Sequence, residues 1–177
     1  MPASSSIMDK RPQKKSSPGY PSIRPTSTPS STRIKVGVKR TRCAKVTFSG
    51  ASKVIKTDTT NAVNIGANNG ATINFTNGGL NIETSTGIGY NADGGGVVTV
   101  QDGGNTILIT GTGKAVRINN TTIGAPGVTF QSVSRATRSS EVGIDLSNTG
   151  TDGAFQVTGV GNTDGSGGTI NSSGSVV

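Results

Sequence analysis

Two aspartates come closest, by residue type and spacing, to a catalytic arrangement. Asp145 and Asp152 lie seven residues apart where the chain repeats most clearly. Two carboxyl groups flanking a glycosidic bond can cleave it, one acting as acid and the other as base or nucleophile. Asp145, however, alternates with Ile144 and Leu146, which turns its side chain outward, and Asp152 precedes a glycine in a turn pattern. We therefore predict no catalytic residues and no enzyme, with a polysaccharide lyase or hydrolase as the alternative.

Four Asp-Gly pairs raise a second chemistry, calcium binding. The aspartates are Asp93, Asp102, Asp152 and Asp164. Calcium-binding β-rolls place the aspartate in a Gly-Gly-x-Gly-x-Asp repeat, which this chain does not contain. Asp-Gly is also a favoured turn pair without any metal. We predict no metal ligands and no cofactor, and calcium binding stays an alternative.

Two further motifs are weaker. Thr84, Thr86, Thr110 and Thr112 form two Thr-x-Thr steps of the kind found in ice-binding ladders. The steps do not recur in each repeat, so ice binding stays a minor alternative. The run from Gly111 to Lys114 superficially matches a phosphate-binding loop. It lacks the glycine five residues before the Gly-Lys pair and the Ser or Thr after it, so we reject that interpretation.

Cysteine and histidine chemistry is almost absent from the sequence. Cys43 is the only cysteine and there is no histidine. An internal disulfide and a cysteine-based zinc site are therefore excluded. No run of apolar residues approaches the roughly 18 that a membrane span needs, and we predict no span.

The positive charge is concentrated at one end of the chain. The formal net charge is +8, but residues 1–45 hold eleven Lys or Arg against Asp9 alone, whereas residues 46–177 hold six against eight acids. A basic tail can contact phosphates without sequence preference. Tyr20 is its only aromatic residue, too few for base stacking. We predict no specific nucleic-acid partner, with tail-mediated association as a minor hypothesis.

The chain divides into three parts by composition. Residues 1–33 are rich in Ser, Pro and basic residues, offer little to bury, and are predicted to be a disordered leader. No apolar stretch follows the charges as in a secretory signal. Residues 34–61 contain alternating patterns at 34–38 and 44–48, which predict strands that cap the coil or lead into it. Residues 62–177 form the repeat region, which we expect to be truncated.

Short apolar strands fill the repeat region. They are expected at 63–65, 73–75, 80–82, 97–100, 107–109, 116–118, 128–130, 144–146 and 155–157, separated by Gly, Asn, Thr or Asp. With 27 glycines and only 3% aromatic residues, a single rounded core would be thin, whereas stacked turns bury a few apolar residues each. Fixed periods of 20–50 residues are typical of such solenoids.

Two interleaved series support a coil. One is expected to stack the strands that begin at Leu80, Val116 and Ile144, and the other those at Val97, Val128 and Phe155. A third sheet is expected from residues 107–109 and 168–170. The fold class is therefore all-β, a parallel β-helix with a disordered basic N-terminal segment. The alternative is an antiparallel β-sandwich, whose strands recur every 8–12 residues.

The repeats resemble a known family over residues 62–174. The segments that carry the resemblance are Gly79–Gly87, Gly94–Val100, Asn105–Ile107, Thr121–Val133, Gly143–Gly150, Phe155–Gly159 and Gly165–Ile170. They resemble the β-strand repeats of large bacterial surface and autotransporter-like proteins, which form right-handed parallel β-helices. The resemblance implies a fragment of a secreted or cell-surface protein that serves as a stalk, spacer or adhesin, with a carbohydrate or protein ligand.

The open ends of a β-helix imply a further partner. Terminal turns expose unpaired strand edges, which invite pairing with another chain. We therefore expect self-association through the ends of the coil.

Overall fold

The computed structural model describes residues 44–172, and these residues contain strands and no helix. The strands are β1 Lys45–Phe48, β2 Lys53–Lys56, β3 Val63–Gly66, β4 Thr72–Phe75, β5 Leu80–Thr84, β6 Tyr90–Asp93, β7 Val97–Val100, β8 Thr106–Ile109, β9 Val116–Asn119, β10 Thr122–Phe130, β11 Ser132–Ser139, β12 Ile144–Ser147, β13 Phe155–Val157 and β14 Ile170–Ser172. The predicted leader, the alternating segment 34–38 and Cys43 lie outside the described residues.

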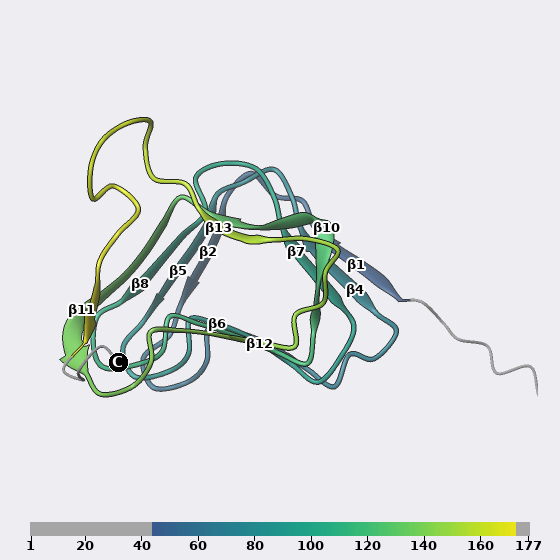
Figure 1. Ribbon diagram of the computed structural model, residues 1–177, viewed down its shortest axis with the longest axis horizontal. Coiled ribbons are helices and arrows are strands. Elements are labelled where there is room, and N and C mark those ends of the chain that lie inside the picture. The colour runs from purple at the N-terminus through teal and green to yellow at the C-terminus, as the bar shows by residue number, and fades with distance from the viewer. Residues whose placement is uncertain (1–43, 173–177) are drawn as a thin grey trace, which may run out of the picture. The chain divides into compact units, whose positions relative to one another are not determined.

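The strands coil into three parallel sheets. Sheet A has the order β1-β4-β7-β10-β13, sheet B the order β14-β11-β8-β5-β2, and sheet C the order β12-β9-β6-β3. Each turn therefore contributes one strand to each sheet. The sheets form three sides of the coil, with β4 and β7 on one side, β5 and β8 on another, and β6 and β12 on the third (Figure 1). Four complete turns are followed by β13 and β14.

The parallel β-helix prediction is confirmed, and the sandwich alternative is wrong. Every strand pair in the described part of the chain is parallel. Partners such as Val63 and Tyr90, or Thr72 and Val97, are 27 and 25 residues apart. The strands at 45–48 and 53–56 pair with β4 and β5, so they belong to the first turn of the coil.

The expected stacking series are correct in part. Val116 and Ile144 do pair, in sheet C, and β7, β10 and β13 are neighbours in sheet A. Leu80, however, lies in sheet B, so grouping it with Val116 was wrong. Strands 107–109 and 170–172 share sheet B as expected, with β11 between them.

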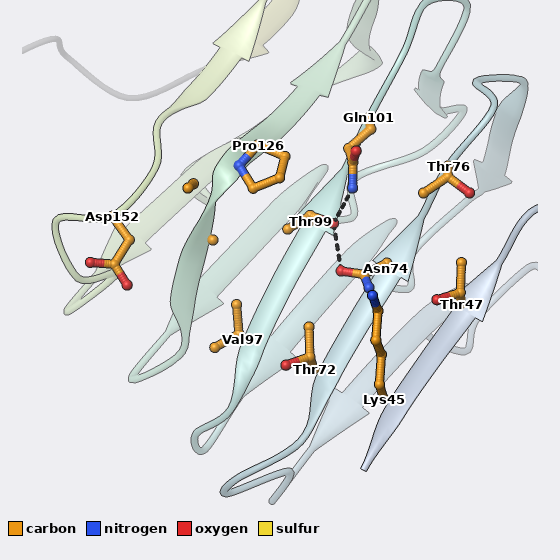
Figure 2. Close-up of a pocket in the computed structure, with 12 residues that line it drawn as sticks. Lys45, Thr47, Thr72, Asn74, Thr76, Val97, Thr99, Gln101, Pro126 and Asp152 are labelled. Atoms are coloured by element: carbon orange, nitrogen blue, oxygen red, sulfur yellow. Dashed lines mark hydrogen bonds between the residues drawn. The ribbon is translucent and has the colours of Figure 1, made fainter. Parts of the chain in front are cut away.

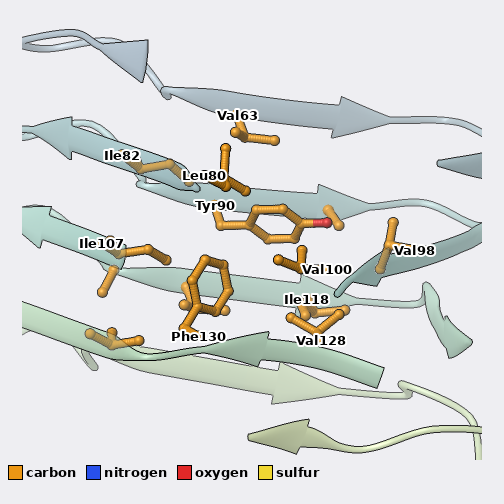
Figure 3. Close-up of a cluster of buried hydrophobic side chains, with 14 of the residues drawn as sticks. Val63, Leu80, Ile82, Tyr90, Val98, Val100, Ile107, Ile118, Val128 and Phe130 are labelled. Carbon is orange, nitrogen blue, oxygen red and sulfur yellow. The ribbon is translucent and has the colours of Figure 1, made fainter. Parts of the chain in front are cut away.

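The interior is a column of apolar side chains from all three sheets. Alternate residues point inward, so that Ile73, Val98 and Ile123 stack in sheet A, and Ile55, Ile82, Ile107 and Val133 stack in sheet B. Figure 3 shows Tyr90 and Phe130 among these aliphatic side chains. The core is long and narrow rather than round, as the low apolar content requires.

Every aromatic residue within residues 44–172 lies in this column. The ring centroids of successive neighbours are 4.8, 6.1, 5.9 and 6.2 Å apart along the series Phe48, Phe75, Tyr90, Phe130 and Phe155. These separations suit stacked and edge-to-face contacts, each of which stabilises beyond the area it buries. The aromatic column therefore joins the first, second and fourth turns and β13, whereas the third turn, β7 to β9, contributes no aromatic residue.

Glycine and asparagine make the corners, as the sequence predicts. Asn120 and Asn148 occupy the same corner in successive turns, with φ of 48° and 51°. Asparagine tolerates this left-handed conformation better than most residues. The Asn148 Nδ2 donates a hydrogen bond to Asn120 Oδ1 at 2.9 Å. The corner residues thus pair between turns as the strands do.

One inward position holds a charged residue. Arg135 of β11 is fully buried and aligns with Ile109 and Ile170 in sheet B. Its guanidinium donates to the carbonyl of Glu141 at 2.8 Å and to that of Asn171 at 3.0 and 2.7 Å. The Asn171 amide donates back to the carbonyls of Arg135 and Ala136. Arg135 therefore ties β14 to the fourth turn.

Candidate functional site

The two aspartates considered for catalysis line different surface depressions. Asp145, on the outer face of sheet C, faces outward as expected and lies with Lys114, Arg117 and Glu141. Asp152 lies in the corner between β12 and β13, beside the outer face of sheet A. The structure does not place the two carboxylates in one site, and so offers no acid–base pair from them.

The carboxylate of Asp145 is committed to an ion pair. The Lys114 ammonium donates to Asp145 Oδ2 at 2.7 Å. This hydrogen bond, with the positive charges of Lys114 and Arg117, holds the pKa of Asp145 below its ordinary value. A lowered pKa keeps the carboxylate ionised, which is unsuited to a general acid near neutral pH.

Ion pairs of this kind join each turn to the next. Lys56 and Glu83 join the first and second turns at 2.6 Å, Arg117 and Asp93 join the third and second at 3.0 Å, and Lys114 and Asp145 join the third and fourth. Exposed pairs each contribute little stability. Their placement nevertheless favours the observed register, because a shifted strand would separate opposite charges.

The Asp-Gly turns are spread over different corners. Asp93 pairs with Arg117, and Asp102 accepts a hydrogen bond from the Asn77 backbone N–H at 2.6 Å. Asp152 and Asp164 lie in other loops. Within residues 44–172, no three His, Cys, Asp or Glu side chains gather as metal ligands would.

Thr84 does not face solvent as an ice-binding ladder would require. It is fully buried at the C-terminal end of β5, and its hydroxyl donates to the Asp58 carbonyl at 3.0 Å. Thr86, Thr110 and Thr112 are exposed. The Thr-x-Thr step at Thr84 is thus part of a corner.

A groove on the outer face of sheet A has a volume of about 820 Å³. It crosses strands from four successive turns, β1, β4, β7 and β10 (Figure 2). Its floor and sides come from Lys45, Thr47, Thr72, Asn74, Thr76, Val97, Thr99, Gln101, Gly124, Ala125, Pro126 and Asp152. We call this surface the sheet A groove.

Hydrogen bonds between turns fix the floor of the sheet A groove. Gln101 Nε2 donates to Thr99 Oγ1 at 2.9 Å, and that hydroxyl donates to Asn74 Oδ1 at 2.8 Å. Asn74 is only 7% exposed and Thr99 only 2%. Such a network holds side-chain orientations fixed before any ligand arrives.

A bulge in β10 forms one wall of the groove. Thr122 and Ile123 pair with Val97 and Val98, but the next paired residue of β10 is Val128, which aligns with Val100. The extra residues, which include Ala125 and Pro126, leave the ladder. Proline has no N–H to donate to a neighbouring strand, which suits it to a bulge. The exposed Pro126 ring stands beside the groove in Figure 2.

Sequence reasoning missed the groove. The sequence feature that marks the groove is a polar residue at the same outward position of successive sheet A strands. Thr47, Asn74 and Thr99 are Cα partners in successive turns. Aligning them requires the true repeat of 25 to 27 residues, which the apolar triplets alone did not give.

The chain is a parallel β-solenoid with a polar groove across one sheet. Comparison with protein-family models, with curated proteins and with solved structures found no match. Within residues 44–172, no helix is long and apolar enough to cross a membrane.

Proposed function

We propose that the chain is a non-catalytic structural or adhesive segment of a secreted or cell-surface β-helix protein. The observation that carries the proposal is the use of the outer charged residues. Glu83, Asp93 and Asp145 each pair with a cation from a neighbouring turn. These carboxylates could otherwise take part in acid–base chemistry, but here they stabilise the register between neighbouring turns of the coil.

The interior supports the same function. Continuous aliphatic stacks connect every turn to its neighbours, and the aromatic column joins the first, second and fourth turns and β13. In solenoids each repeat contacts only the repeats beside it, so length can be added without redesigning a core. Such a rod suits a stalk or spacer, and its outer sheets offer extended surfaces for adhesion.

We further propose that copies of the chain associate through the ends of the coil. The outer edges of β1, β2 and β3 pair with no described strand, and Val46, Phe48 and Val54 are exposed there. Exposed apolar side chains beside free strand edges favour strand addition.

The absence of catalysis in the proposed role is tested by measuring turnover of polysaccharides. The full chain is incubated with soluble polysaccharides, and release of reducing ends and of unsaturated products is followed. We expect no depolymerisation above a heat-denatured control.

The rival function is a carbohydrate-active enzyme, and Asp152 at the sheet A groove is the observation that favours it. Turnover that disappears in Asp152→Asn or Asp145→Ala, while the thermal unfolding midpoint is kept, would replace the non-catalytic proposal. Turnover that survives both substitutions points to a contaminant.

A further inference from the structure

We propose that the sheet A groove binds a neutral, extended polysaccharide that lies across the turns of the coil. The inference names a ligand class for the adhesive role and therefore rests on the proposed function. The groove spans four turns. Parallel strands lie about 4.8 Å apart, so its side chains recur along the coil at that spacing. A polymer with repeating groups matches a surface with repeating groups.

The charge distribution of the groove selects a neutral ligand. Its only formal charges are Lys45 and Asp152, which lie at opposite ends in Figure 2. A polyanion would gain one cation and meet one carboxylate, and a polycation the reverse. Between the two charges the polar lining consists of hydroxyl and amide groups.

The hydrogen-bonding groups suit a ligand rich in hydroxyls. Asn74 Oδ1 is occupied by Thr99, whereas Asn74 Nδ2 has no hydrogen-bond partner among the described residues. The side-chain hydroxyls of Thr47, Thr72 and Thr76 likewise make no hydrogen bond within residues 44–172. A sugar hydroxyl both donates and accepts, so it can satisfy the amide donor and the threonine hydroxyls in turn.

The walls provide the apolar contact that a sugar ring also requires. Val97 lies within the groove, and Ala125 and Pro126 stand exposed on the β10 bulge. The C–H faces of a pyranose ring can pack on these aliphatic surfaces while its hydroxyls reach the floor. The lining contains no aromatic ring. We therefore expect modest affinity per sugar, with total affinity growing with chain length until the groove is filled.

The test uses the full chain and paired threonine variants. Thr72 lies in the groove on β4, and Thr106 lies on β8 at an outward position of sheet B. Both side chains are half-buried. Binding of dextran, a soluble β-glucan and galactomannan is measured by affinity electrophoresis and calorimetry, with polygalacturonate as the anionic comparison.

We expect at least one neutral polysaccharide to bind the wild type, with little dependence on salt. Thr72→Arg should weaken that binding by about tenfold or more, because the long side chain fills the groove. Thr106→Arg should leave it unchanged, and both variants should unfold at the wild-type midpoint. Gln101→Ala gives a second, smaller loss without blocking the groove.

Three results would overturn the inference: no binding of any neutral polysaccharide, tighter binding of polygalacturonate, or equal loss in both arginine variants. None of these results would contradict the structural role proposed for the coil. Depolymerisation of a bound polysaccharide would instead end the non-catalytic proposal while leaving the groove as the ligand site. The two proposals therefore fail separately.

Discussion

Asn105 is a buried amide that completes the hydrogen bonds of a corner. Its Oδ1 accepts from the Leu80 backbone N–H at 3.0 Å. Its Nδ2 lies within 3.1 Å of the carbonyls of Gln101, Asp102 and Thr129. One side chain thus connects three successive turns, where the backbone ladder is interrupted. No apolar residue can replace these contacts.

Asn105→Ala should lower the free energy of unfolding by about 1–3 kcal/mol, because it leaves the buried Leu80 N–H without an acceptor. Asn105→Asp should cost at least as much, since a carboxylate would face three carbonyl oxygens. Asn81→Ala, at an exposed outward position of β5, is the matched control and should be nearly neutral. Denaturant titration measures all three. Equal stability of the Asn105 and Asn81 variants would contradict the role assigned to Asn105.

The ring of Tyr90 packs against other aromatic rings, whereas its hydroxyl makes no hydrogen bond within residues 44–172. The ring lies between Phe75 and Phe130 in the aromatic column. The hydroxyl is buried and has no hydrogen-bond partner in the described part of the chain. Burial raises the pKa of the Tyr90 phenol above its ordinary value, because the phenolate would lose its hydration. The neutral phenol is therefore the folded form.

Tyr90→Phe should raise the free energy of unfolding by about 1 kcal/mol, since it removes an unpaired polar group and keeps the ring. The raised pKa adds a pH dependence. Its contribution to stability is complete below the unfolded-state pKa of about 10 and is lost as pH rises above it. The variant should therefore lose less stability than the wild type above about pH 10. Denaturation curves across that range measure the difference, and parallel curves would rule the explanation out.

At the scale of an element, the corner between sheets B and C depends on close backbone approach. A Cβ on Gly87 would lie 2.0 Å from the Thr60 carbonyl oxygen, and one on Gly113 would lie 2.2 Å from the Gly87 oxygen. These glycines stack in successive turns. Even the smallest side chain there would push two turns apart.

Gly87→Ala should therefore destabilise the coil by about 3 kcal/mol, at the upper end for overpacking. Gly103 provides the control, because a Cβ there meets nothing within 4 Å and its φ is not positive. Gly103→Ala should be neutral or slightly stabilising, since alanine lowers the entropy of the unfolded chain. Thermal unfolding of both variants decides the matter. A tolerated Gly87→Ala would mean that the corner can separate at little cost.

All nine strands predicted in the repeat region, each with two or more large apolar residues, are present, but β2 was not predicted although it carries Val54 and Ile55. Sequence reasoning missed β6, whose inward residues are Tyr90 and the small Ala92. That strand depends on backbone partners in β3 and β9, which no local pattern reveals. It also missed β11, where Arg135 occupies an inward position. Its carbonyl partners come from Glu141 and Asn171, outside any local repeat.

The sheet A groove was beyond prediction for a related reason. Its polar residues alternate with the apolar ones, so each is visible as an outward position. Their alignment needs the register, and the register needs all three strands of a turn. Because β6 and β11 were absent from the prediction, Leu80 was assigned to the wrong sheet.

For the molecule as a whole, the two ends of the coil differ in charge. The first turn carries Lys45, Lys53 and Lys56 against Asp58. Residues 139–172 carry Glu141, Asp145, Asp152 and Asp164 and no Lys or Arg. Apolar side chains are exposed at both ends, including Phe48 on β1 and Val157 on β13. Opposite charge with apolar surface favours contact between unlike ends over contact between like ends.

Contact between unlike ends is heterologous and can propagate into filaments. We therefore expect the full chain to sediment as a concentration-dependent series of oligomers, and added salt to weaken association by screening the charges. Phe48→Lys should abolish it, because it places a charge on the apolar end. The matched control is Leu108→Lys on the outer face of sheet B, because Leu108 is 40% exposed and Phe48 is 47% exposed. Leu108→Lys should leave the association unchanged. A monomer at every concentration, or equal loss in both variants, would show that the ends of the coil do not join.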